Sequence, residues 1–365
     1  MYILGVNISH HPSSCLLKDG EVQYFIEEER LNKTKNCHIE EKEDLPQKNG
    51  ALKTFRNGFS AVPPVKHIDH IIFTSFGSVH HDPRRMELVK KTLASAGITW
   101  GEVHYDHFEH HIYHAANAFY MSGVDDAVAI IKDGSGALQD FKGVEHITDQ
   151  YLPDEVAYRE IESIYSCNYD GIKELEKHYS NFAGDYKYFV RGTRTFTSHL
   201  ACGWLFQKIC AMIGFHYRGA DAGKLMGMAA YGEIVHDRPW YKEHNGFLQS
   251  DNRIVFEDTQ SIDADNFETI ANFAAKLQQE TCGYTIHTIQ KVIDKYNPKN
   301  IVLSGGYFMN CVNNYKYVKA FPDINFFVDP IAFDCGTALG AAKLLWYNIS
   351  KSQTKHPHSI YLGHY

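Results

Sequence analysis

The strand-and-helix pattern of this chain starts twice, and this repetition limits the folds that are open to it. Strand-like runs at 2–8, 14–18 and 21–29 begin the sequence, and a tight KDG turn separates the last two. The pattern restarts near 125, where residues 126–141 read as a strand, a glycine turn and a second strand. Strands that alternate with helices and then restart predict two related α/β lobes around a cleft. A length of 365 residues suits two lobes.

The segments between these strands predict further parts of both lobes. Residues 68–75 return as a buried strand, and residues 83–97 read as a helix that Gly97 ends. Residues 36–65 are polar and predict an excursion loop. Residues 145–195 are polar and aromatic with weak periodicity, which predicts loops and short helices over the cleft.

The C-terminal part has stronger patterns. An apolar helix is expected at 198–215 and a long amphipathic helix at about 265–296. A buried strand turns into a helix over 300–310, and a further strand covers 324–330. Residues 335–349 read as a last helix whose small residues allow close packing.

Composition disfavours several classes of function. The formal net charge of −8 gives no general affinity for nucleic acid or an anionic membrane. The eight cysteines form no C-x-x-C pair, and several lie in apolar runs, as free thiols in a reducing compartment do. The chain opens directly into a strand pattern without signal-peptide features, and it lacks an apolar run of about 18 residues. We therefore expect a soluble, cytoplasmic protein.

The segment HFEHHIYHAANAF, residues 107–119, contains four histidines and reads as a helix over roughly 107–120. Residues four apart share a face of a helix, so His107 pairs with His111 and His110 pairs with His114. Either pair could hold one metal ion between neighbouring turns. The alternative is a histidine-rich surface helix in a chain that has 22 histidines, and this segment alone does not decide.

Two glycine turns, DGSG at 133–136 and SGG at 304–306, allow backbone N–H groups to approach an anion closely. Each alone is more often a simple hairpin, but together they match the acetate/sugar-kinase–actin architecture, in which nucleotide lies between two lobes. Kinases of that architecture carry an acidic D-x-G-(S/T) after the first strand. This chain has GVNISHHPSSC at 5–15, with His10 and His11 in the loop. Histidine is the better proton acceptor and the poorer Mg²⁺ ligand, which favours acyl-type transfer to a hydroxyl, although His10 can also be a structural loop residue.

Five sequence blocks, taken together, resemble the O-carbamoyltransferases of the nodulation-factor and antibiotic-tailoring type. The first domain of that family is similar to the universal tRNA threonylcarbamoyladenosine protein. The blocks are ILGVNISHHPSSCLLKDGE with EEERL, HHIYHAANAFY, KDGSG, AGKLMGMAAYG and LSGGYFMNCVNN with DPIAFDCGTALGAA. The resemblance covers essentially the whole chain and implies a duplicated, ribonuclease H-like α/β fold.

The resemblance implies a site made of two histidines and one carboxylate. His110 and His114 match the two metal histidines, and Asp334 matches the carboxylate ligand, which suits iron(II) or a similar divalent metal. Asp133 lies at the matching glycine turn, near or on the metal. His10 matches the proposed catalytic base.

The resemblance also implies an adenine nucleotide pocket for ATP or carbamoyl-adenylate, with carbamoyl phosphate as the donor. Asp221 would contact the ribose or the acceptor, and His11 would contact the acceptor. The chain departs from the family at His11, which replaces an aspartate, at Ala137, which replaces a glutamate, and at FMN, which replaces ALN at 308–310. These departures concern the acceptor side more than the metal side. The nucleotide positions are Gly134, Gly136, Lys224, Gly305, Gly306, Asn310 and Asn314.

We expect lobe I at 1–124, lobe II at 125–355, and a junction to a second domain at 356–365. The expected function is carbamoyl transfer to a small-molecule, sugar or modified-nucleoside hydroxyl. The alternatives are threonylcarbamoyl transfer to tRNA, and a nucleotide-binding subunit that is inactive without a partner. Because the resemblance ends at the junction, we expect a separate adenylate-forming domain or protein, and a homodimer is a further possibility.

Overall fold

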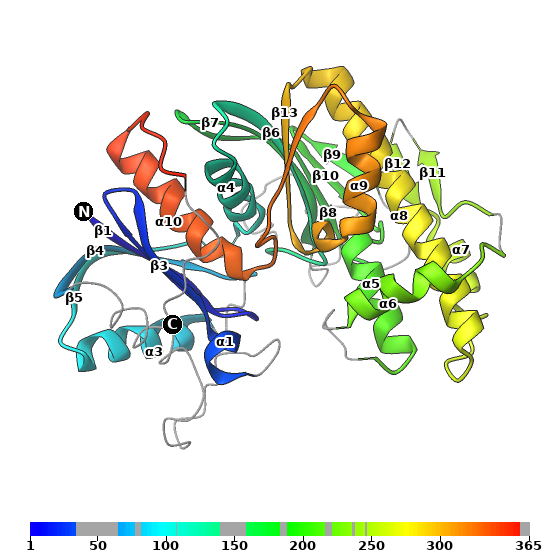
Figure 1. Ribbon diagram of the computed structural model, residues 1–365, viewed down its shortest axis with the longest axis horizontal. Coiled ribbons are helices and arrows are strands. Elements are labelled where there is room, and N and C mark those ends of the chain that lie inside the picture. The colour runs from blue at the N-terminus through cyan, green and yellow to red at the C-terminus, as the bar shows by residue number, and fades with distance from the viewer. Residues whose placement is uncertain are drawn as a thin grey trace, which may run out of the picture.

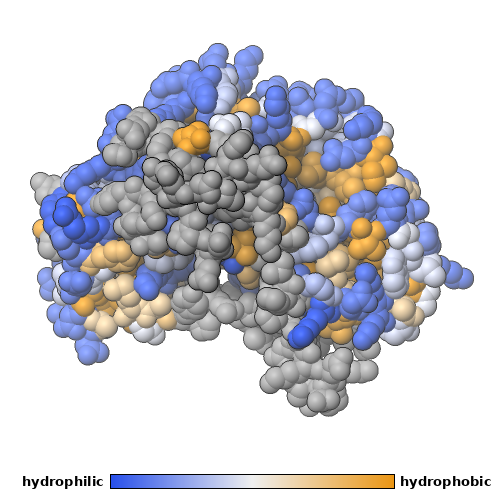
Figure 2. Space-filling view, turned by 180° about the vertical axis from the view of Figure 1, so that it is seen from behind, coloured by the Kyte–Doolittle hydropathy of each residue, from blue (hydrophilic) through white to orange (hydrophobic). Residues whose placement is uncertain are grey.

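The computed structural model describes residues 1–33, 65–76, 82–106, 108–138, 158–182, 188–215, 221–235, 238–244 and 247–357. Nearly all of the expected excursion at 36–65, His107 and most of the expected junction lie outside these residues. Figure 1 shows two α/β units side by side, each built around its own sheet. Figure 2 shows the opposite side, where hydrophilic residues cover much of the described surface and hydrophobic residues gather in a few separate patches.

The first unit is a five-stranded sheet in the order β3-β2-β1-β4-β5. Strand β1 pairs antiparallel with β2 and parallel with β4. Asp19 and Gly20 have φ angles of 51° and 86°, so the expected KDG turn uses the left-handed region. The short helix α1 (Glu28–Asn32) follows the third strand, and α3 (Asp82–Ser95) ends before Gly97, whose φ is 74°. The strands are β1 (Tyr2–Asn7), β2 (Ser13–Lys18), β3 (Glu21–Glu27), β4 (His67–Thr74) and β5 (Thr99–Tyr105).

The second unit is a seven-stranded sheet in the order β14-β13-β6-β7-β8-β10-β9. Strand β6 restarts the pattern, and it pairs parallel with β13 and antiparallel with β7. A separate hairpin joins β11 (Tyr241–His244) to β12 (Phe247–Ser250). The seven strands are β6 (Asp126–Lys132), β7 (Arg159–Asn168), β8 (Gly171–Ser180), β9 (Tyr188–Arg191), β10 (Arg194–Thr197), β13 (Asn300–Ser304) and β14 (Asn325–Val328).

Two expectations for this sheet are wrong. The region at 145–195 contributes β7 to β10 instead of loops and short helices. Its strands bury charged residues, including Glu160, Glu162 and Lys177, so the usual apolar–polar alternation is hidden. The second strand expected directly after the DGSG turn is also not formed as far as the chain is described, because Leu138 makes only an isolated bridge with Arg159.

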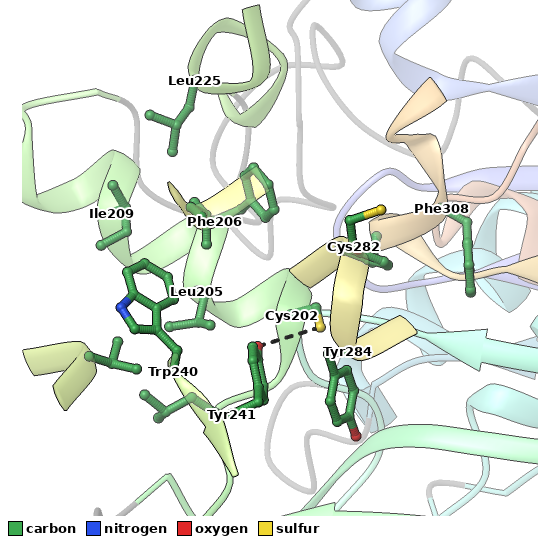
Figure 3. Packing of buried hydrophobic residues seen from close by; sticks show 14 of the residues in the cluster. Cys202, Leu205, Phe206, Ile209, Leu225, Trp240, Tyr241, Cys282, Tyr284 and Phe308 are labelled. Atoms are coloured by element: carbon green, nitrogen blue, oxygen red, sulfur yellow. Dashed lines mark hydrogen bonds between the residues drawn. The ribbon is translucent and has the colours of Figure 1, made fainter. Parts of the chain in front are cut away.

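The helices of the second unit pack around an aromatic core. Trp240, Tyr241 and Tyr284 lie near residues of α5, including Leu205 (Figure 3), and the Cys202 thiol is 3.7 Å from the Tyr241 hydroxyl. Among the described residues, no helix is both long enough and apolar enough to cross a membrane. These helices are α5 (Cys202–Met212), α6 (Ala222–Met228), η1 (Ala229–Tyr231), α7 (Asn252–Thr259), α8 (Phe267–Tyr296), η2 (Gly306–Met309) and α9 (Cys311–Ala320).

Helices α4 (His111–Ser122) and α10 (Cys335–Ser350) join the two units (Figure 1). Helix α10 packs on β1, β2 and β4, helix α4 packs on β6, β7 and β13, and the two helices pack on each other. A Cβ atom on Gly5 would lie 2.0 Å from the Ala338 carbonyl oxygen, and one on Gly340 would lie 2.0 Å from the Tyr113 carbonyl oxygen. The expected close packing of the last helix is confirmed. The lobe boundaries stay a prediction, but the last helix packs on the first sheet.

Gly340→Ala should lower the free energy of unfolding by about 1–3 kcal/mol, because the new methyl group overpacks the contact between α10 and α4. Gly283→Ala, in the middle of α8, is the matched control, since a Cβ there meets no atom within 4 Å. It should raise that free energy by about 0.5–1 kcal/mol, the usual effect of replacing a helical glycine. Urea denaturation of both variants measures the difference, and equal effects would contradict the packing argument.

Candidate active site

Four buried side chains from distant parts of the sequence meet beside the contact between α4 and α10. His110 immediately precedes α4, and His114 lies in its first turn. Asp133 follows β6, and Asp334 immediately precedes α10. The ends of one strand and two helices thus converge, as the restarted topology predicts.

The ligand atoms of these four residues all lie within 4.8 Å of one another. The Nε2 atoms of His110 and His114 are 3.2 Å apart. Asp334 Oδ1 lies 3.4 Å from His110 Nε2 and 3.7 Å from His114 Nε2. Asp133 Oδ2 lies 3.6 Å from His110 Nε2. Ligand atoms that share one ion at bond lengths of about 2.0–2.2 Å lie roughly 3.0–3.6 Å apart, so these residues fit a divalent transition metal.

The charges of this cluster shift its pKa values in opposite directions. Burial alone would lower the pKa of His110, but the carboxylates of Asp334 and Asp133 raise it well above its ordinary value. Burial would raise the pKa of Asp334, but His10 and His110 hold it well below its ordinary value. Two buried carboxylates are therefore kept ionised, and they favour a cation at this position.

The helix begins later than expected, at His111 instead of about residue 107. His110 has non-helical φ and ψ angles of −132° and −51°. Asp106 explains the delay, because its Oδ1 accepts a hydrogen bond from the backbone N–H of Phe108 at 2.9 Å, which favours a local turn over a helix. The spacing of four residues still brings His110 and His114 together across the N-cap.

His111 faces away from the cluster, toward β7. Its Nδ1 lies 2.8 Å from Ser163 Oγ, and its backbone N–H donates to Glu160 Oε2 at 3.2 Å. Burial lowers the pKa of His111 to about 4, so the ring is neutral at neutral pH. His107 lies outside the described residues, so the structure does not test the second histidine pair.

Asn7, which the sequence analysis did not single out, holds the first loop in place. Its Nδ2 donates to the carbonyl oxygens of His10, His11 and Asp334 at 3.0–3.1 Å. Its Oδ1 accepts hydrogen bonds from Ser9 N and Ser9 Oγ at 3.0 and 2.7 Å. The sequence contained one signal for Asn7: it is a polar residue at the end of the first strand, where kinases carry a carboxylate.

His10 borders the cluster from this loop. Its Nε2 lies 3.4 Å from Asp334 Oδ2, and its side chain is 26% exposed. Burial lowers the pKa of His10 although Asp334 acts in the opposite direction, so the imidazole is neutral at neutral pH. His11 has a left-handed φ of 55°, and its ring stacks on Phe333 with centroids 4.9 Å apart.

Glu160 on β7 is a second residue that the sequence analysis missed. Its carboxylate accepts hydrogen bonds from Ala137 N at 3.1 Å and from Lys177 Nζ at 2.7 Å. Lys177 Nζ also lies 2.9 Å from Oε2 of Glu109. Glu109 directly precedes His110, the first residue of the metal-type cluster formed by His110, His114, Asp133 and Asp334. This buried network ties the DGSG turn and the start of α4 to the second sheet. Nothing in the local pattern distinguishes Glu160 from the solvent-facing acids of a strand.

A cavity of about 460 Å³ opens beside the cluster, within the usual size range of ligand pockets. Its walls come from the His10 loop, the DGSG turn, α5, α6, η2 and the start of α10. The sequence-predicted residues that line it are His10, His11, Asp133, Gly134, Lys224, Gly306, Asn310 and Asp334.

The other six sequence-predicted residues do not line this cavity, namely His110 and His114 of the cluster and Gly136, Gly305, Asn314 and Asp221. Gly136 packs against Glu160 and His111, and Gly305 has a φ of 97° at a close approach to the Lys132 carbonyl oxygen. Asn314 donates to the Phe308 carbonyl oxygen at 2.6 Å, and Asp221 pairs with Lys224 at 2.8 Å. Asn310 borders the cavity, but its side chain bonds Gln278 and caps α9. Its amide is thus engaged within the protein.

Comparisons with known proteins show what this chain is similar to. The family model described as carbamoyltransferase N-terminus matches residues 85–343. Nodulation protein NolNO of Sinorhizobium fredii (strain NBRC 101917 / NGR234) is 23% identical over 375 residues, which cover 94% of this chain and 47% of NolNO. An uncharacterised protein of Methanocaldococcus jannaschii is 24% identical over 362 residues, which cover 93% of this chain and 56% of that protein. The chain spans about half the length of these curated relatives.

Solved structures confirm the expected two-lobed fold. The crystal structure of T. kodakarensis HypF matches with a TM-score of 0.60 at 14% identity, over 97% of this chain and 48% of HypF. Full-length HypF in the phosphate- and nucleotide-bound form matches with a TM-score of 0.56 at 15% identity, over 96% and 56%. At this identity the likeness concerns the fold alone.

His110→Ala and His114→Ala should each abolish stoichiometric metal, because each removes one imidazole of the cluster. His111→Ala is the control and should keep most of the metal, since His111 contacts Ser163 instead. Elemental analysis of the purified variants measures the metal content. Metal retained in His110→Ala would contradict the choice of this histidine pair.

Proposed function

Because the chain belongs to the carbamoyltransferase family, we propose that it transfers a carbamoyl group from carbamoyl-adenylate to an acceptor hydroxyl. The acceptor would be a sugar, another small molecule or a modified nucleoside. The observation that carries this proposal is one cavity lined by His10, by the two carboxylates of the metal-type cluster, Asp133 and Asp334, and by the glycine-rich edge at Gly306. A neutral base, a cation site and backbone donors at one cavity are what acyl transfer to a hydroxyl requires.

His10 is the proposed general base. With Nε2 facing Asp334 Oδ2, a proton on Nε2 is favoured, and Nδ1 keeps the lone pair that accepts the hydroxyl proton. As that proton moves to His10, the acceptor oxygen forms a bond to the carbamoyl carbon. The bond between this carbon and the adenylate phosphate oxygen breaks, and AMP leaves with the bonding electrons. Asp334 stabilises the resulting imidazolium.

His110, His114, Asp334 and Asp133 would hold a divalent metal, and two imidazoles with carboxylates suit iron(II) or a similar ion. Such an ion supplies Lewis-acid stabilisation of the carbamoyl oxygen and of the adenylate leaving group. Asp133 Oδ1 also accepts a hydrogen bond from Gly306 N at 3.2 Å, so the metal-type cluster and the second glycine turn are held together.

The remaining walls of the cavity would hold the nucleotide. Gly134, Lys224 and Gly306 border it with small or cationic groups. A Cβ on Gly306 would come within 2.9 Å of Asp133 Oδ1, so glycine is needed for this approach. HypF, which has a similar fold, has been crystallised in a phosphate- and nucleotide-bound form, and this supports a nucleotide in the present cavity. We assign the donor half-reaction to carbamoyl phosphate and ATP, and place the reaction in the cytoplasm.

The direct test is incubation of the chain with carbamoyl phosphate, ATP, a carbamoyl-adenylate-forming domain of a full-length relative and candidate hydroxyl acceptors, followed by intact-mass analysis of the acceptors. Addition of one carbamoyl group that depends on both cosubstrates is the expected result. AMP release in the same reactions reports on the donor side. Nucleotide binding without any carbamoylated product, across sugar and nucleoside acceptors, would contradict the proposed transfer.

His10→Asn should lower turnover by about 10²–10⁴-fold, the usual contribution of a general base, and leave nucleotide affinity unchanged. His11→Asn is a matched control, because asparagine tolerates the left-handed conformation that His11 adopts. It should lower turnover much less. Calorimetric nucleotide titration beside the rate assay separates a lost base from a distorted pocket, and wild-type turnover in His10→Asn would make His10 a structural residue.

A further inference from the structure

A second cluster of metal-type ligands lies on the first sheet, far along the chain from the cavity residues. His70 is on β4, and Glu102 and His104 are on the neighbouring edge strand β5. In the parallel register His70 pairs with Glu102, and His104 lies two residues further along β5. Residues two apart on a strand share a face, so the three side chains project from one face of the sheet.

The three ligand atoms form a nearly regular triangle. His70 Nδ1 and His104 Nε2 are 3.2 Å apart. Glu102 Oε2 lies 3.6 Å from His70 Nδ1 and 3.6 Å from His104 Nε2. Three ligands at bond lengths of about 2.0–2.2 Å around one tetrahedral ion have separations of roughly 3.3–3.6 Å. The observed separations of 3.2–3.6 Å are close to these values, so little side-chain movement is needed to hold an ion.

We propose that His70, Glu102 and His104 form a second site for a divalent transition metal of the zinc(II) type. Two imidazoles and one carboxylate are ligands that zinc, nickel and copper accept. The side chains are 16%, 74% and 31% exposed, so an ion reaches the site from solvent and keeps an open coordination position. This site is separate from the buried cluster at the cavity.

A hydrogen bond between the two imidazoles would account for their own separation without an ion. It would not account for one carboxylate oxygen at equal distances from both nitrogens, while Glu102 is otherwise mostly exposed. The bound ion would cross-link the edge strand β5 to β4. Zinc should therefore raise the free energy of unfolding with the logarithm of its concentration once the site is saturated, because a ligand that binds only the folded state raises its stability.

The test is equilibrium dialysis of the purified chain against zinc(II), followed by elemental analysis. His70→Ala and His104→Ala should each bind one equivalent less zinc than the wild type. His67→Ala is the matched control, because His67 lies on the same strand, is exposed and contacts Thr99 instead. It should keep the wild-type stoichiometry. The same stoichiometry in the wild type, His70→Ala and His104→Ala would overturn the proposal.

A second measurement follows thermal stability, so it does not require the zinc ions at the two sites to be counted. In the His110→Ala/His114→Ala variant, which lacks the cluster at the cavity, added zinc should still raise the thermal unfolding midpoint. Adding His70→Ala to that variant should remove the increase. An increase that persists in the triple variant would show that zinc binds elsewhere and would overturn the proposal. If the cavity variant fails to fold, the zinc-induced increase should be smaller in His104→Ala than in the wild type, since both keep the cavity cluster, and an equal increase in the two would overturn the proposal.

Discussion

The backbone contact between α4 and α10 is the constraint on which the site depends. Gly340 allows α10 to touch the Tyr113 carbonyl oxygen, one residue before His114. Because α10 begins directly after Asp334 and α4 begins directly after His110, the helix contact sets the separation of their ends. A wider contact would move the carboxylate away from the two imidazoles. The ligand distances of 3.2–3.7 Å are thus a consequence of helix packing.

Buried charged residues near this contact are paired with residues of opposite charge. Glu160 with Lys177, and Glu162 with Lys132, form ion pairs on neighbouring strands of the second sheet. Removing one member of such a pair would leave a buried charge without a partner, which is strongly destabilising. Glu160 also brings a carboxylate to the DGSG turn, whose following residue, Ala137, has none of its own. The turn is therefore held by the sheet and not only by its glycines.

Much of the fold was predictable from the sequence, and the largest failure, the strands of 145–195, has a physical cause. The apolar runs that became β1, β6 and β13 and the long periodic helix α8 follow from local pattern alone. Strands β7 and β8 were missed because their buried acids and Lys177 are satisfied only by tertiary partners that a local window does not contain. The choice of His110 and His114 as a metal pair came from the resemblance, and the structure places these two residues beside Asp133 and Asp334. Asn7 and Glu160 act by holding other residues in place. Asn7 had a signal in its position at the end of the first strand, whereas Glu160 had none.

The amide of Asn7 also limits how this loop could change over evolutionary time. Three carbonyl oxygens face its Nδ2. Aspartate has nearly the same shape, yet it would place a carboxylate against those three oxygens with no hydrogen to share. The acidic residue that kinases use at the end of the first strand is therefore incompatible with the loop that presents His10. An Asn7→Asp change would therefore be tolerated only together with a rearrangement of the loop that carries His10.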